Sequence, residues 1–121
     1  MDERELCFLP AATALTQFRN AQLSPVELLN ALITRSEKVE PSINAFTDRY
    51  FEDALAKAAE AEQRYAKGNP RPLEGLPIAI KDEVAVGGQR STQAHIPGIL
   101  QPCGHILGTG HGLLSTDSRK Q

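Results

Sequence analysis

Apolar residues recur every three or four positions in three segments of the first seventy residues, and this spacing predicts three helices. The first helix is expected over residues 11–19, where Ala12, Leu15 and Phe18 share one helical face. It should end near Asn20.

The second predicted helix has the clearest start in the chain. Ser24 can cap it, Pro25 suits the first helical position, and Glu27 can reach back to the cap. We expect this helix over 25–38, because Pro41 disfavours helical backbone in the residue before it. Its apolar stripe comprises Val26, Leu29, Leu32 and Ile33.

The third predicted helix runs from Phe51 or Glu52 to Lys67. Acidic residues in its first turn complement the helix dipole, and Lys67 followed by Gly68 gives a basic last turn and a stop. Its expected contact face consists mostly of small side chains: Leu55, Ala58, Ala59 and Glu62 or Tyr65.

Strand signals are shorter than the helical ones. Residues 43–47 are expected to be extended, residues 76–80 form an apolar run of strand length, and a turn is expected at 87–88. From residue 94 onward, glycine and proline are frequent and no periodic segment is long, so regular structure is not expected. The pattern predicts about three helices, one or two short strands and an irregular C-terminal tail.

Composition limits the class of protein. The 121 residues allow one domain at most, and a formal net charge of −2 excludes a basic nucleic-acid or membrane-binding surface as the default. The chain lacks a long apolar run and opens with acidic residues, so a cytoplasmic protein is expected. Cys7 and Cys103 should then remain reduced.

Charge divides the chain into two parts. Residues 1–93 carry 14 acidic and 11 basic side chains, whereas residues 94–116 carry none. All three histidines lie in this uncharged stretch. We therefore expect one unit over 1–93 and a separate, irregular tail over 94–121.

Lys81 is the first candidate for chemistry, because it directly follows the predicted strand 76–80. A lysine held in a low-dielectric site favours the neutral amine, which can accept a proton. The spacing alone favours a solvated lysine that pairs loosely with Asp82 or Glu83.

A resemblance to a known family changes that preference. The segment PLEGLPIAIKD at 72–82 resembles the PLxG(I/L)P(I/V)A(I/V)KD motif of the amidase signature family. Further matches follow in the family's order over about residues 6–93. They are LSPVEL at 23–28, INAF at 43–46, the alanine-rich helix at 54–67, and Val86, Gly88, Ser91 and Thr92.

The resemblance implies an α/β fold and a serine hydrolase or amidotransferase, which cleaves or transfers carboxamides with a serine, a second serine on a cis peptide, and a lysine. Lys81 matches the lysine, which would serve as the base for a serine nucleophile. Gly75 and Pro77 would fix the start of the strand before it. Asp82 matches the family's KD pair, and we expect a structural role for it.

The sequence departs from the family after Thr92. The glycine- and serine-rich segments that hold the family's serines and oxyanion hole have no counterpart, and Ser115 and Ser118 lack that context. We expect an N-terminal portion of an amidase, ended near residue 94 by truncation, frameshift or a changed reading frame. With Lys81 alone, it should not hydrolyse amides, although a small-molecule amide is the expected substrate if the site is completed.

Two other classes of function stay open. The chain could be a non-enzymatic module that binds another polypeptide through exposed apolar surface, or supplies Lys81 to it. Cys103, His105 and His111 are zinc-type ligands, but their spacing matches no common site and lacks a fourth ligand. The glycine-rich run at 108–112 lacks the strand, helix and lysine of a phosphate loop. We therefore expect no metal and no cofactor.

Overall fold

The computed structural model describes residues 1–82, 84 and 105–107 of the chain. Within these ranges the elements are four helices and three short strands, which confirms the α/β class. The helices are α1 (Glu3–Cys7), α2 (Ala11–Arg19), α3 (Pro25–Ile43) and α4 (Phe51–Ala66), and the strands are β1 (Asp48–Arg49), β2 (Ile78–Ile80) and β3 (His105–Leu107).

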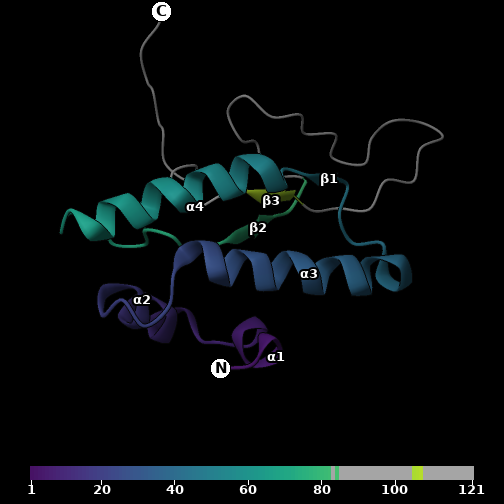
Figure 1. Ribbon diagram of the computed structural model, residues 1–121. Helices are drawn as coiled ribbons and strands as arrows, with labels where there is room; N and C mark the ends of the chain where they lie inside the picture. The colour runs from purple at the N-terminus through teal and green to yellow at the C-terminus, as the bar shows by residue number, and fades with distance from the viewer. Residues whose placement is uncertain (83, 85–104, 108–121) are drawn as a thin grey trace, which may run out of the picture.

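Helix α3 lies in the middle of the arrangement, with α1 and α2 on one side and α4 on the other (Figure 1). Two apolar clusters follow from this placement. Leu28 and Ala31 of α3 pack with Leu6 and Phe18 from the first two helices, whereas Leu29 packs with α4. The long helix therefore carries buried residues on more than one face, beyond the single stripe that the sequence predicts.

Helix α2 has the predicted bounds, and α4 ends one residue before the predicted Lys67. Gly68 follows with φ +71°, a conformation that glycine adopts without strain. The predicted contact face of α4 is confirmed at Ala58, which is buried, and at Leu55 and Tyr65, which pack against the core, but it is wrong at Ala59, which is exposed. Ala54 and Ala61 are also buried. A face of alanines allows α4 to approach α3 closely.

Helix α3 continues five residues beyond the predicted end at Lys38 and passes through Pro41. The prediction of extended chain at 43–47 is therefore wrong at Ile43, which is helical, and at Asn44, which is left-handed; the strand β1 begins at Asp48. The Glu40 side chain explains the longer helix: its carboxylate accepts hydrogen bonds from the amides of Ala45 (2.8 Å) and Phe46 (3.2 Å) beyond the helix end. Asn44 ends the helix in the left-handed conformation, and its amide donates to the Glu40 carbonyl.

Helix α1 is an addition to the helices predicted from the sequence. Asp2 and Glu5 form a reciprocal capping box, and Leu6 is buried against α3. The charged opening of the chain therefore forms a short helix that contributes one apolar residue to the core.

The three strands form one sheet in the order β1-β3-β2. Strand β3 pairs in parallel with β1 and antiparallel with β2, with Ala79 opposite Ile106. The central strand thus comes from the segment in which the sequence predicts irregular chain. A three-residue strand has no period to detect, and pairing on both sides stabilises it. The turn predicted at 87–88 lies outside the described residues.

Candidate functional site

Lys81 directly follows β2, and it differs from its neighbour Asp82 in exposure to solvent. The Lys81 side chain is exposed, whereas only 1% of Asp82 is accessible to solvent. The Lys81 carbonyl accepts a hydrogen bond from the Val84 amide (2.9 Å), so the chain turns at this point. The chain thus presents a lysine directly after a paired strand, beside a buried aspartate. The structural role expected for Asp82 stays a prediction.

Upstream of β2, a buried carboxylate holds the turn that leads into the strand. Glu74 is 1% exposed, and its carboxylate accepts two hydrogen bonds from the Arg71 side chain, at 2.5 and 2.7 Å, and one from the Arg71 amide. The Arg71 guanidinium beside Glu74 lowers the pKa of that carboxyl, despite the opposing effect of burial. Glu74 therefore stays ionised and keeps the turn closed.

The same turn is attached to the C-terminal part of α4. The Tyr65 hydroxyl donates a hydrogen bond to the Glu74 carbonyl (2.9 Å), and Arg64 forms an ion pair with the Glu74 carboxylate (3.8 Å). Burial raises the pKa of Tyr65, and Glu74 adds to this while Arg19 opposes it. We call Arg64, Tyr65, Arg71 and Glu74 the Glu74 clamp.

Gly75 is required by both backbone conformation and space. Its φ is +83°, and an added Cβ would lie 2.7 Å from Cγ of Pro25 and 3.4 Å from Cε2 of Phe18. The turn therefore packs directly against the start of α3. Together with the Glu74 clamp, this contact fixes the direction in which the chain enters β2 and so the position of Lys81.

Pro77 directly precedes β2 and lies beside α3, where it lines an apolar groove with Ile78 and Ala79. The structure thus brings Gly75, Pro77, Lys81 and Asp82 into one segment, as their sequence order requires. The catalytic assignment of Lys81 stays a prediction.

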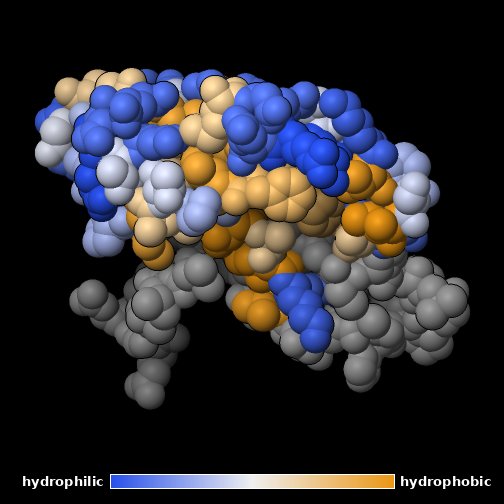
Figure 2. Space-filling view, turned by 90° about the horizontal axis from the view of Figure 1, so that it is seen from below, coloured by the Kyte–Doolittle hydropathy of each residue, from blue (hydrophilic) through white to orange (hydrophobic). Residues whose placement is uncertain are grey.

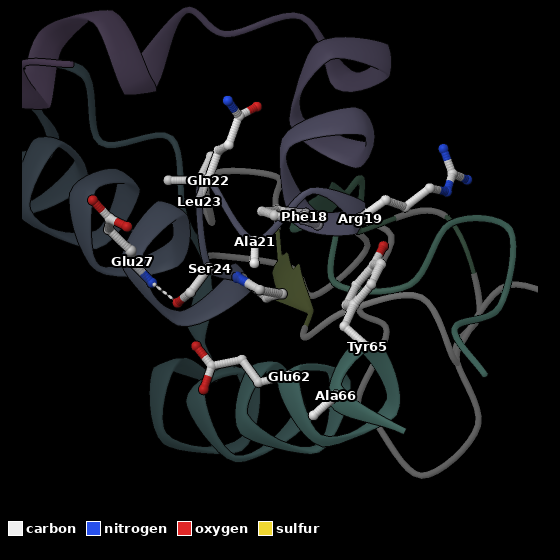
Figure 3. A pocket seen from close by; sticks show the side chains of 11 residues that line it. Phe18, Arg19, Ala21, Gln22, Leu23, Ser24, Glu27, Glu62, Tyr65 and Ala66 are labelled. Carbon is white, nitrogen blue, oxygen red and sulfur yellow. Dashed lines mark hydrogen bonds between the residues drawn. The ribbon is translucent and has the colours of Figure 1, made fainter. Parts of the chain in front are cut away.

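A separate cavity of about 380 Å³ opens between the end of α2, the start of α3 and the end of α4 (Figure 3). Its lining includes Phe18, Glu62 and Tyr65 but, among the described residues, none of the four predicted site residues. Ser24 also lines this cavity, but its hydroxyl accepts a hydrogen bond from the Glu27 amide (3.0 Å) and so caps α3, as the sequence predicts. This cavity presents no paired nucleophile and base among the residues described.

The remaining candidates fall largely outside the described residues. This applies to Cys103, His111, Ser115 and Ser118, and to the motif residues from Val86 to Thr92; of His105 only the backbone is described. In the part of the chain that the structure covers, no cluster of three or more histidine, cysteine or acidic side chains could hold a metal. In the same part, no helix is long and apolar enough to cross a membrane.

The residues that sequence reasoning missed are those of the Glu74 clamp. Arg71 and Glu74 are three residues apart, a spacing that in a turn allows an ion pair. The contribution of Arg64 and Tyr65 depends on how α4 packs, which the spacing does not reveal.

Comparison with known proteins gives a consistent result. The family model described as Amidase matches residues 27–96, more than half of the chain. A glutamyl-tRNA(Gln) amidotransferase subunit from Trichlorobacter lovleyi is 46% identical over 79 residues, which are 65% of this chain and 16% of the relative. The protein of the same name from Rickettsia bellii is 41% identical over 88 residues, 73% of this chain and 18% of the relative. The chain therefore spans less than a fifth of these relatives, and no solved structure matches it significantly.

Proposed function

The chain belongs to the amidase family, and we propose that it supplies Lys81 as the base of a site that hydrolyses carboxamides. In the proposed reaction, the amine takes the proton of a serine hydroxyl and the serine oxygen attacks the amide carbon. The C–N bond then breaks, the nitrogen leaves with that proton, and water releases the acid. The serine would come from the part of an amidase domain that extends beyond the matched segment.

The observation that carries the proposal is the fixed position of Lys81. The Glu74 clamp and the Gly75 contact hold the segment before β2 at both α3 and α4, so the backbone of Lys81 has a defined place. Its side chain is exposed in the described part of the chain. A polypeptide that covers this end of β2 would exclude water, and burial favours the neutral amine that a base requires.

A chimera tests this proposal. Residues 1–96 of this chain would replace the corresponding N-terminal part of the Trichlorobacter lovleyi relative, and ammonia release from glutamine and from a simple aliphatic amide would be measured. We expect activity in the chimera and a loss of about 100-fold or more in Lys81→Ala, since proton transfer by a positioned base contributes on that order.

Lys67→Ala is the matched control, because Lys67 is an exposed lysine that follows the end of α4 and lies outside the segment leading to β2. It should keep the activity of the chimera. The 121-residue chain alone should release no ammonia. Equal activities of the Lys81→Ala and unmodified chimeras would refute the proposal, and Lys81-dependent hydrolysis by the chain alone would refute the need for a completing segment.

The second candidate is a non-enzymatic module that binds another polypeptide. Hydrophobic side chains reach the surface in the middle of the face seen from below, under a band of hydrophilic ones (Figure 2). An exposed apolar area of this kind favours contact with another polypeptide. A chimera that folds but releases no ammonia would favour this alternative over the hydrolase.

A further inference from the structure

An apolar groove of about 260 Å³ lies between α3 and the start of β2. Helix α3 contributes Leu32, Ile33, Val39 and Ile43, and the strand side contributes Pro77 and Ile78. Ile43 is 59% exposed, although it belongs to this apolar lining. The free energy falls when another apolar segment covers a surface of this kind.

The groove also contains one polar group that lacks a partner. Ser36 is only 7% exposed, and within the described part of the chain its hydroxyl has no hydrogen-bond partner. A buried hydroxyl without a partner costs free energy, and such groups are normally satisfied in a complete structure. Because Ser36 lines the groove, an occupant could supply the missing partner.

The length of the relatives indicates what the occupant is. The matched segment covers 16–18% of these proteins, so more than four fifths of a family member lies beyond it. The groove is formed partly by Pro77 and Ile78, which lead directly into Lys81. A segment seated there would adjoin the strand that presents the proposed base.

We infer that this groove is the docking surface for the remaining part of an amidase domain. The occupant is an apolar segment with one backbone or side-chain group that hydrogen-bonds to Ser36 Oγ. This inference rests on the proposed function, because it identifies the surface through which the site would be completed.

Two exposed apolar residues provide a matched test. Ile43 (59% exposed) lies in the groove, whereas Leu73 (58% exposed) lies outside it. Ile43 is the last residue of α3, where a positive charge suits the helix dipole, so lysine at either position should be tolerated by the chain alone. In the chimera, Ile43→Lys should lower Tm by at least about 3 °C because it places a charge in the contact, and Leu73→Lys should not. Thermal melting of both variants in both backgrounds measures this difference.

Three outcomes would overturn the inference. The two variants could have equal effects in the chimera, or the unmodified chimera could fail to fold. Alternatively, Ile43→Lys could lower Tm in the chain alone, or convert a dimer to a monomer there, which would assign the groove to this chain's other residues or to a second copy. A folded chimera with the Ile43-specific shift but no hydrolysis would leave the inference intact and refute the proposed function. An active chimera without that shift would support the proposed function and refute the inference.

Discussion

At the scale of single residues, the segment that leads to Lys81 depends on two very different side chains. Glu74 is a buried acid whose charge is compensated by Arg71 and Arg64, and Gly75 has no side chain because Pro25 occupies the adjacent space. Both residues belong to the motif at 72–82, but only Gly75 can be recognised from the sequence. The motif marks the turn in which a glycine can adopt positive φ, so Gly75 can be identified from the sequence. The partners of Glu74 depend on how the chain packs, so they cannot.

Replacing Gly75 with alanine should destabilise the chain by about 2–4 kcal/mol, because positive φ and a Cβ that overlaps Pro25 are both unfavourable. Gly68→Ala is the control: its φ is +71°, but an added Cβ would meet nothing within 4 Å. That variant should cost only about 1 kcal/mol. Urea unfolding compares them, and equal losses would show that the Pro25 contact contributes nothing.

Stability should also depend on pH through Glu74. Its folded-state pKa lies below its unfolded value of about 4.3, so the carboxylate stabilises the fold above that pH and loses this effect as pH falls through the folded pKa. Glu40 acts in the same direction. Burial acts to raise the pKa of Glu40, but hydrogen bonds from the Ala45 and Phe46 amides and from Arg49 together outweigh it and lower that pKa.

We therefore expect the free energy of unfolding to decrease from about pH 5 downward. Glu74→Gln should lower it by about 1–3 kcal/mol at pH 7 and reduce its dependence on acid, because charge-assisted hydrogen bonds from Arg71 are lost. Glu52→Gln changes an exposed carboxylate in α4 and should keep the acid dependence. Denaturant titrations between about pH 3 and pH 7, in steps of about one unit, would reveal the difference.

At the scale of elements, the helices follow their local signals except where a tertiary contact intervenes. Pro41 predicts the end of α3, but the Glu40 carboxylate binds the amides beyond the helix end and the helix continues to Ile43. Alanine-rich α4 has several small residues on its surface, and packing against α3 selects Ala54, Ala58 and Ala61. In such a helix the periodicity predicts only a broad apolar sector of the surface, and it does not determine which alanines in that sector are buried.

Adjacent alanines of α4 test this selection. Ala58 is fully buried and Ala59 is exposed, so Ala58→Leu should destabilise the chain by about 1–3 kcal/mol through overpacking. Ala59→Leu should change the stability by no more than about 0.5 kcal/mol. Urea unfolding followed by circular dichroism measures both; equal losses for the two variants would restore the face expected from the sequence, which includes both alanines.

At the scale of the whole molecule, the described part of the chain is a set of helices around α3 with a small sheet, and the sheet joins distant parts of the chain. Strand β3 comes from residues 105–107 and lies between β1 and β2. Tertiary pairing determines this strand, because three residues carry too little local signal to specify it. The groove beside β2 likewise results from how α3 and the strand approach each other.

Capping residues, helical spacing and the motif at 72–82 are local signals, and they were enough to predict the three longer helices, the strand before Lys81 and the family. The length of α3, the place of β3, the buried face of α4 and the Glu74 clamp emerged only from the folded chain. So did the burial of Asp82 next to Lys81. The physical reason is that burial and ion pairing depend on residues far apart in the chain, which spacing along the sequence cannot bring together.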